Sequence, residues 1–429
     1  MIRKKVGTIT LAIGLIIVGV TLFANNFTSI EMIDIYKYWP VLLIGVGLEM
    51  FVYVIIHRHD ENVKLRIDGL CIVFIIVAII FSSNVNGFSF NPGFSFNPFQ
   101  GNVLVDGVMY KSELKETIVK DNISENFRIT KLTARNSFGD VKLQPYDKKY
   151  IKVEARVTVR YNDEKAAKEY VKNVVKIIEG EQTQIYSAEY NGINRNEYGK
   201  ALVDFVIYVP QAVYAEVYNS FGDINAQGIV KDLDITNQHG DVNVKDIGGS
   251  VAVKNSFGEI EVKDIGGKLD ANNQYGDIYA ENINGSVNIE TGFGKLAVSD
   301  ITGQLIAKNN YGKITVKNIM GDAQMKTSFG DIEASNIGGN AVISNNNGSI
   351  EVKELTGNAE IRNSFGKISY RSSNLENANI YAKTSFGNID TDLPLNVTKA
   401  INDQTVQGIV GEGKYKIELI TSNGEIELK

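Results

Sequence analysis

Residues 255–272 read NSFGEIEVKDIGGKLDAN, and the pattern of this 18-residue unit recurs through the second half of the chain. Its clearest mark is a glycine at every eighteenth position: Gly222, Gly240, Gly258, Gly276, Gly294, Gly312, Gly330, Gly348 and Gly366. A fixed period this short is typical of a structure that grows one coil at a time, each coil stacked on its neighbours. It predicts a long repetitive surface rather than one deep pocket.

Within one unit, two short segments alternate between apolar and polar residues, at 259–263 and 268–272, and each follows a glycine turn. Such alternation is typical of β-strands with one buried face. The positions expected in the core are Ile260, Val262, Ile265, Leu269 and Ala271, and one coil later Ile278, Ala280, Ile283, Val287 and Ile289. We therefore predict an all-β fold over residues 211–429, a parallel β-solenoid of nine or ten coils about 4.8 Å apart and on the order of 45 Å long.

An aromatic column beside the glycines is a candidate binding surface. Its members are Phe221, Phe257, Tyr275, Phe293, Tyr311, Phe329, Phe365 and Phe386. The rings could form a stacking platform for sugars or peptides, or a corner stack that seals the core, and both interpretations stay open. His239 and Asn347 stand in the same column and are expected to interrupt it.

An asparagine column precedes the rings by two positions, with threonine on some coils. It comprises Asn219, Asn237, Asn255, Asn273, Asn309, Asn345 and Asn363. Stacked amides can bond along the axis, as in other cross-β arrays, and we expect these to do so.

Residues 103–210 do not follow the 18-residue register, and we interpret them as a capping β-rich region with one helix. A solenoid needs such a cap, because a bare first coil would offer its strand edge to other chains. Alternation over residues 150–161 predicts a strand, and Asn162 is expected to cap a helix over residues 163–178. At the other end the register slips after Ile380, and the charged last strand is expected to guard the edge.

Residues 1–82 hold three apolar runs, at 6–23, 39–56 and 65–82, each about long enough to cross a bilayer. We predict a three-helix transmembrane anchor in the lipid bilayer, followed by a Gly/Pro/Phe linker at residues 83–102. Cations precede the first and third runs, and the positive-inside rule places both flanks in the cytoplasm. The expected topology is a multi-pass cell-membrane protein with a cytoplasmic N-terminus and an extracellular C-terminal domain.

Glu49 lies in the middle of the second apolar run. An acid inside a membrane is a candidate functional residue with a partner inside the bundle. The alternative is that Glu49 bonds a neighbouring helix of the same protein, and the sequence leaves both interpretations open.

The remaining chemistry is sparse. A net charge of −6 gives no basic footprint for nucleic acid, and no nucleophile elbow, phosphate loop, HExxH or paired-cysteine motif is present. Acids follow several of the turn glycines, but Lys295, Lys313 and Lys367 take the same position on other coils. A repeated calcium site would not accept lysine as a ligand, so we expect no metal site. Because the motifs above are missing, we also expect no cofactor and no catalytic residues.

Two resemblances follow from these motifs. The units NSFGDINA, NSFGEIEV and TSFGDIEA, preceded by VIYVPQAVYAEV, resemble the bacterial β-strand-repeat family of putative adhesins, a domain of unknown function, over about residues 103–429. The runs AIGLIIVGVTLF and YWPVLLIGVGLEM are similar to the LiaI–LiaF-type transmembrane region of Gram-positive envelope-stress proteins, over about residues 7–53. Neither resemblance implies catalytic residues.

We therefore expect a membrane-anchored, non-enzymatic surface module with an adhesin-like or envelope-stress role. Its expected partners are cell-wall polymer, a peptide or an envelope protein. An alternative is a regulator of a membrane sensor kinase or transporter that acts through the transmembrane bundle. A polysaccharide-acting β-helix enzyme is less favoured, because no acid pair or histidine stands out from the repeat.

Overall fold

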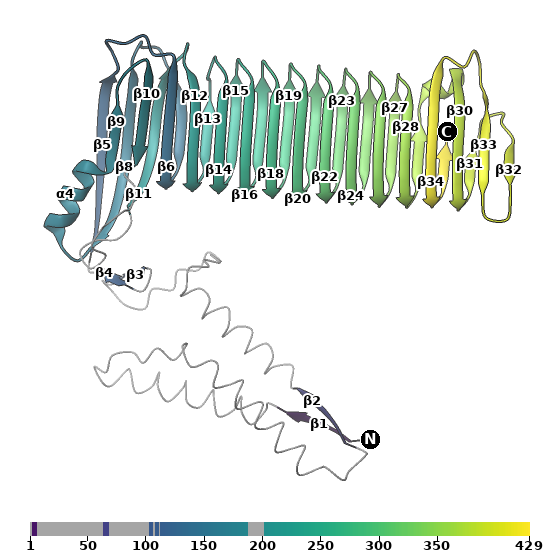
Figure 1. Cartoon of the computed structure of the whole chain (residues 1–429), viewed down its shortest axis with the longest axis horizontal. Coiled ribbons are helices and arrows are strands. Elements are labelled where there is room, and N and C mark those ends of the chain that lie inside the picture. Colours follow the sequence, from purple (N-terminus) through teal and green to yellow (C-terminus); the bar gives the residue numbers. More distant parts are fainter. Residues whose placement is uncertain (1, 7–62, 68–102, 106–107, 111, 188–200) are drawn as a thin grey trace. The chain divides into compact units, whose positions relative to one another are not determined.

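The computed structural model describes residues 2–6, 63–67, 103–105, 108–110, 112–187 and 201–429 (Figure 1). The chain divides into two compact units, Met1–Lys111 and Ser112–Lys429. In the first unit β1 (Ile2–Val6) pairs in parallel with β2 (Val63–Ile67). In the same unit β3 (Val103–Val105) and β4 (Val108–Tyr110) form an antiparallel pair.

Most of the three apolar runs, and Glu49 with them, lie outside the described residues. Within the described ranges, no helix has the length and apolar character needed to span a membrane. Two ends of the predicted spans need correction, because Val6 closes β1 and residues 65–67 belong to β2. These residues are therefore strand and not the first turn of a helix.

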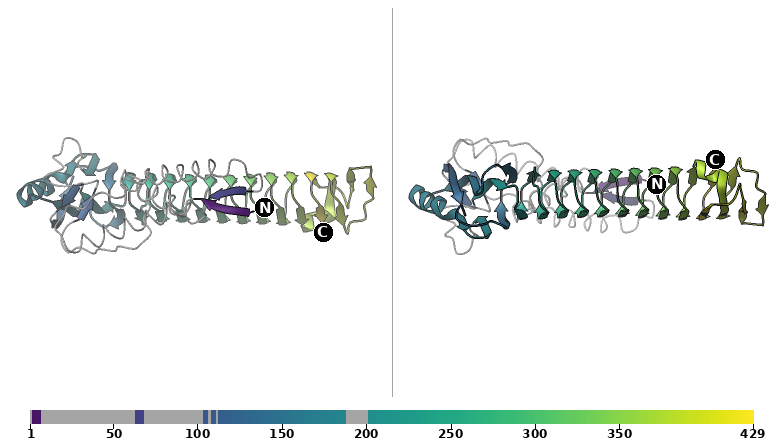
Figure 2. Two further views of the ribbon diagram at one scale, coloured as in Figure 1. Left: turned by 90° about the horizontal axis from the view of Figure 1, so that it is seen from below. Right: turned by 90° about the horizontal axis from the view of Figure 1, so that it is seen from above.

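The second unit is a two-layered parallel β-solenoid, as the repeat predicts. Each coil gives one strand to each of two sheets, which have 16 and 15 strands, and Figure 2 shows the sheets as two facing rows. The first sheet holds β12 (Tyr214–Phe221), β14 (Leu233–His239), β16 (Val251–Phe257), β18 (Leu269–Tyr275), β20 (Val287–Phe293), β22 (Leu305–Tyr311), β24 (Ala323–Phe329), β26 (Ala341–Asn347) and β28 (Ala359–Phe365). The second holds β13 (Ile224–Gln227), β15 (Val242–Ile247), β17 (Ile260–Ile265), β19 (Ile278–Ile283), β21 (Leu296–Ile301), β23 (Ile314–Ile319), β25 (Ile332–Ile337), β27 (Ile350–Leu355) and β29 (Ile368–Arg371).

The strands pair in register, so each core position lies directly against its equivalent on the next coil. Ile260 pairs with Ile278, for example, and Leu269 pairs with Val287. All ten core positions named from the sequence are buried, with exposed fractions of 2% or less. The predicted assignment of faces is therefore confirmed.

The turn glycine explains why the coils can stack this closely. Gly276 has φ +136°, and a Cβ at this position would lie 2.0 Å from the carbonyl oxygen of Gly258 on the preceding coil. Only glycine fits both the left-handed conformation and the close approach.

The buried asparagine column bonds differently from the expectation. Asn273 Nδ2 donates to the Gly258 carbonyl oxygen at 2.7 Å, and Asn309 Nδ2 donates to that of Gly294 at 2.7 Å. The amides thus bond the turn backbone of the preceding coil and not the next amide, and Thr291 makes the same bond through its hydroxyl. The column fastens each turn to the one before it.

The N-terminal cap comprises β5 (Ser112–Ile123), β8 (Ile151–Tyr161), α4 (Glu164–Val174), β9 (Val175–Ile178), β10 (Gln182–Ser187) and β11 (Leu202–Pro210). The helix is shorter than predicted, because its last expected residues form β9 instead. Its N-cap is Asp163 and not Asn162, since the Asp163 carboxylate accepts from the backbone N–H of Lys165 and Ala166. Ala167, Val171 and Val174 of α4 are buried.

Both ends of the solenoid contain a coil inserted out of chain order. At the N-terminal end, β6 (Lys131–Phe138) and β7 (Val141–Tyr146) lie between β10 and β11 on one side and β12 and β13 on the other. The C-terminal end is built from η2 (Ser373–Asn377), β30 (Ala378–Phe386), β31 (Ile389–Thr391), β32 (Val397–Lys399), β33 (Gln404–Ile409), β34 (Tyr415–Asn423) and β35 (Ile426–Leu428). There β34 and β35 lie between the coil of β28 and β29 and the coil of β30 and β31.

The expectation that the charged last strand guards an edge is therefore wrong. β35 is an internal strand, and the strands at this edge are β31 and the hairpin of β32 and β33. The glutamate of β35, Glu427, is only 6% exposed. Its carboxylate pairs with Lys367 at 2.8 Å, Arg371 at 2.8 Å and Lys429 at 2.9 Å, so the charges of the last strand hold it in the ladder.

The facing of the strands leads to a first prediction. Ile260→Asp places an unpaired carboxylate in the core and should destabilise the solenoid by several kcal/mol, whereas Glu261→Ala on the outer face should change stability by no more than about 0.5 kcal/mol. Urea denaturation of the two variants measures the difference. Equal effects would overturn the assignment of the two faces.

The Glu427 cluster leads to a second prediction, on pH. Lys367, then Lys429 and Arg371, hold the pKa of Glu427 well below its ordinary value of 4.5. A lowered folded-state pKa contributes stability that is complete above the unfolded pKa and is lost as pH falls through the folded pKa. Glu427→Gln should therefore lower the melting temperature at pH 7 and lower it less at about pH 3.

The matched control is Glu425→Gln, which removes a more exposed carboxylate from the same strand end. It should change the melting temperature little at either pH. A Glu427→Gln effect that stays constant between the two pH values would contradict the assignment.

Candidate binding surface

From Phe138 to Phe329 the aromatic column forms a continuous ring stack, on the outside of the turn that contains the glycine of the 18-residue period. Neighbouring rings are parallel within 8°, with centroids 4.6–5.2 Å apart. The stack comprises Phe138, Phe221, His239, Phe257, Tyr275, Phe293, Tyr311 and Phe329. We call this set, with Phe365 and Phe386, the ring strip.

His239 does not interrupt the column, contrary to the expectation. Its imidazole stacks between Phe221 at 4.6 Å and Phe257 at 4.8 Å. Asn347 does separate two rings, because it pairs in the ladder with Phe329 on one side and Phe365 on the other. Asn423 of β34 likewise lies between Phe365 and Phe386.

The eight ring positions named from the sequence lie at the surface. Their exposed fractions run from 40% for Tyr275 to 61% for Phe386. Inside the stack each ring covers the faces of its neighbours, so the strip presents ring edges to solvent. Edge-to-face packing is a favoured geometry for aromatic pairs, so exposed ring edges suit contact with aromatic side chains of another protein.

A row of charged residues runs directly beside the ring strip, two positions further along each coil. Its acids also have a structural task. One oxygen of Asp241 accepts the backbone N–H of Glu259 at 2.7 Å, and one oxygen of Asp277 accepts that of Lys295 at 2.7 Å. Each of these two aspartates thus has one oxygen bonded to the neighbouring coil. Within the described ranges no group of three or more potential metal ligands is present.

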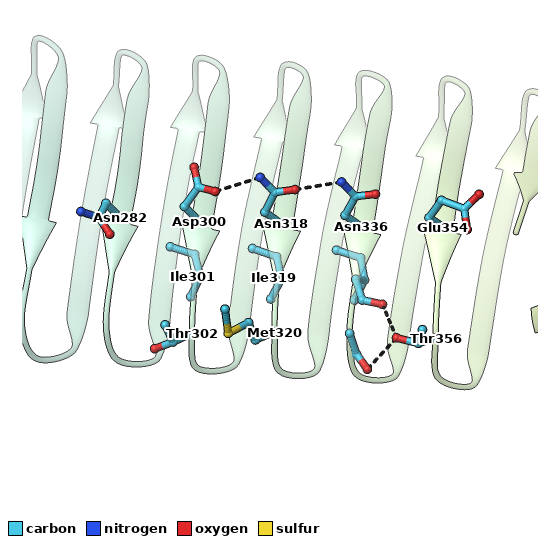
Figure 3. Close-up of a pocket in the computed structure, with 12 residues that line it drawn as sticks. Asn282, Asp300, Ile301, Thr302, Asn318, Ile319, Met320, Asn336, Glu354 and Thr356 are labelled. Atoms are coloured by element: carbon cyan, nitrogen blue, oxygen red, sulfur yellow. Dashed lines mark hydrogen bonds between the residues drawn. The ribbon is translucent and has the colours of Figure 1, made fainter. Parts of the chain in front are cut away.

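A second surface feature is a shallow groove of about 530 Å³ at the other turn (Figure 3). Asp300, Asn318 and Asn336 lie side by side there on consecutive coils. Asn318 donates to Asp300 at 2.8 Å and Asn336 donates to Asn318 at 2.9 Å. The exposed Met320 lies at the lower edge of the groove in this view.

Asn282, Asp300, Asn318, Asn336 and Glu354 of the groove belong to a column of residues in the left-handed conformation, which sequence reasoning missed. Its φ values lie between 54° and 60°. The non-glycine members are Asp246, Asp264, Asn282, Asp300, Asn318, Asn336 and Glu354. A signal was present, because Asp or Asn recurs at this one position and these residues tolerate the left-handed region better than most. The column forms part of the turn, and its hydrogen bonds are made within the protein.

Comparison with known families agrees with the motifs. The family model described as Toastrack DUF4097 matches residues 273–429, and that of the LiaI-LiaF-like transmembrane region matches residues 9–51. Both matches are shorter than the ranges expected from the sequence. No curated protein matches the chain.

Three solved structures show weak similarity. A "putative cell adhesion protein" from Clostridium sporogenes has 13% identity and a TM-score of 0.18, and covers 74% of this chain and 99% of its own. A "putative lipid binding protein" from Parabacteroides distasonis has 14% identity and a TM-score of 0.26, with coverages of 60% and 96%. A "putative adhesin" from Bacteroides fragilis has 11% identity and a TM-score of 0.22, with coverages of 74% and 98%. Scores this low support no inference about fold or function.

The two family matches bear out both resemblances drawn from the motifs. The chain is therefore similar to the Toastrack DUF4097 family over residues 273–429 and to the LiaI-LiaF-like transmembrane region over residues 9–51.

Proposed function

We propose that this protein is a membrane-anchored, non-enzymatic surface-interaction module whose solenoid lies outside the cell. The observation that carries the proposal is the ring strip, in which half-exposed ring edges follow one another over successive coils. A folded protein that keeps a row of large apolar edges in solvent is typically one that contacts another molecule there. The partner class is cell-wall polymer, peptide or envelope protein.

The anchor part of the proposal is supported by the match to the LiaI-LiaF-like transmembrane region. It is also supported by the pairing of β1 with β2. β1 contains Arg3, Lys4 and Lys5 before the first apolar run, and β2 contains Lys64 and Arg66 at the start of the third. Their side-by-side position agrees with two flanks on the same side of the membrane, as the positive-inside rule requires.

The non-enzymatic part is supported by the repeated character of the surface. Asp223, Asp241 and Asp277 beside the ring strip each use one carboxylate oxygen to bond the backbone N–H of the next coil. The same structural task at successive coils fits a repeated binding surface better than a single catalytic centre.

The topology can be tested with a site-specific protease. A cleavage site placed in the linker, residues 83–102, should be cut when the protease is added to intact cells, which releases the solenoid into the medium. The matched control has the same site between the second and third apolar runs, at residues 57–64, and should be cut only after the cells are permeabilised. Protection of the linker site in intact cells would reject an outside solenoid.

A second candidate function is favoured by the position of Glu49 inside the region that matches the LiaI-LiaF-like family. In this alternative the transmembrane bundle regulates a sensor kinase or transporter, with the solenoid as its input. Glu49→Gln should then change the output of an envelope-stress reporter, because an intramembrane acid bonds its partner strongly. An unchanged reporter, with the solenoid still released by the linker protease, would exclude this role.

A further inference from the structure

The charged row beside the ring strip changes sign along the solenoid. Each member follows a turn glycine and lies against its equivalent on the next coil. In chain order the row reads Asp140, Asp223, Asp241, Glu259 and Asp277, then Lys295, Lys313, Asp331, Ser349 and Lys367. In the ladder, Asp204 continues the row beside Asp140, and Glu425 continues it beside Lys367. The N-terminal half is entirely acidic, and all the lysines lie in the C-terminal half.

The acidic half lacks compensating cations. Within residues 112–187 and 201–429, no lysine or arginine forms an ion pair with Asp241, Glu259 or Asp277. Partial burial, then Asp241, Asp277 and Glu261, raises the pKa of Glu259 above its ordinary value. The carboxylates are thus crowded on a surface that also carries exposed ring edges. Such a surface favours a binding partner with positively charged side chains.

Lys295 is the complementary feature. It is exposed, and in the same described ranges no carboxylate forms an ion pair with it. Lys313 pairs with Glu333 at 2.6 Å and Lys367 with Glu427 at 2.8 Å, so these two are partly neutralised within the chain. The strongest uncompensated contrast therefore lies at the centre of the row, between Asp277 and Lys295, which are one coil apart.

We propose that the ring strip and the charged row form an antiparallel interface with a second copy of this chain. A two-fold axis that lies in the plane of the interface, perpendicular to the solenoid axis, makes the second solenoid run in the opposite direction. It also keeps each row opposite itself, so the charged row meets the charged row and rings meet rings. A parallel dimer would instead place the charged row opposite the small polar residues that precede the rings.

One register pairs the two uncompensated central charges, Asp277 and Lys295, with each other. With the axis between the coils of Asp277 and Lys295, Asp277 faces the partner's Lys295 and Glu259 faces the partner's Lys313. Asp140 faces the partner's Lys367 in the same register. The unfavourable pairs are Asp241 with the partner's Asp331 and Asp204 with the partner's Glu425. A shift of one coil in either direction places Asp277 opposite itself or Lys295 opposite itself, and like charges in direct opposition disfavour a register.

The rings agree with this register. Tyr275 faces the partner's Phe293, and Phe257 faces the partner's Tyr311, so aromatic edges meet over the central coils. Aromatic residues are enriched in the buried centre of protein interfaces. Isologous dimers with a two-fold axis are also the commonest homo-oligomers.

In this arrangement the partner in the surface interaction is a second copy of the chain, so the inference rests on the proposed function. In an antiparallel pair the two copies of Ser112, where the anchors connect, lie at opposite ends. This geometry suits solenoids that extend from two opposed cell surfaces, and the interaction would then be homophilic adhesion between cells.

The test uses the full chain, displayed on cells and also purified in detergent. Lys295→Asp makes the centre wholly acidic and Asp277→Lys makes it wholly basic. Each variant alone should lose self-association by about tenfold or more, because like charges then oppose one another twice across the axis. A mixture of the two variants should associate within about threefold of the wild-type chain, since both central pairs are restored.

Three controls keep the test sharp. Lys326→Asp, an exposed lysine of β24 away from the turn, makes the same charge change and should leave association unaltered. Lysine is tolerated in the row at Lys295, Lys313 and Lys367, so Asp277→Lys should fold, and a melting curve checks it. Asp277→Asn retains the oxygen that accepts from Lys295 N–H and should weaken association less than Asp277→Lys.

The readouts are sedimentation of the purified chain and clumping of mixed cell populations. Recovery only in the mixture supports the antiparallel register. A wild-type chain that stays monomeric at about 100 μM in detergent and does not clump cells would overturn the interface, as would single variants that associate normally. Loss of the dimer together with a released solenoid in the linker assay would reject this inference alone, whereas a dimer in detergent with a protected linker would reject the outside location.

Discussion

The close contact between turn glycines of successive coils is the constraint on which the solenoid depends. Each turn carbonyl lies where a side chain of the next coil would otherwise be, as Gly276 shows against Gly258. Because the backbones touch there, the strands on either side can maintain parallel pairing in strict register. Register then aligns the apolar positions into columns, and the columns form the core. The asparagine amides, which bond the same carbonyls, hold the turn at this spacing.

This constraint also determines the surface. Once the turns repeat at the spacing of a β-ladder, any residue type that recurs at one position becomes a continuous row. Phenylalanine and tyrosine at the position before the glycine stack because the ladder spacing is close to the preferred separation of parallel rings. The histidine stacks equally well, since the imidazole is flat and its place in the ladder is fixed by the backbone. The exposed ring edges are thus a consequence of turn geometry before they are a binding surface.

Much of the solenoid could be predicted from the period alone. Apolar residues at alternate positions are explained by strands with one buried face, and a glycine at every eighteenth position is explained by the close contact of stacked turns. Ile260, Val262 and Ile265 are buried as expected. The α4 cap was misplaced by one residue, because Asn162 and Asp163 are both good capping residues and only the geometry distinguishes them. The exposure of the rings could not be predicted, since an aromatic column fits a sealed corner as well as an open one. The out-of-order coils could not be predicted either, because pairing between distant segments leaves no periodic signal in the chain.

The inserted coils affect how the solenoid responds to mechanical load. Tension applied at Ser112 acts on β5, an edge strand that pairs with β8 alone and can be peeled away one residue at a time. The next strand of the chain, β6, is held on both sides by β10 and β12. Peeling therefore stops after one strand, because further extension must pull a coil out from between two others. At the opposite end β34 is enclosed by β28 and β30 in the same way. A domain that releases one edge strand under load and then resists further unfolding is well suited to a protein that is pulled from one end.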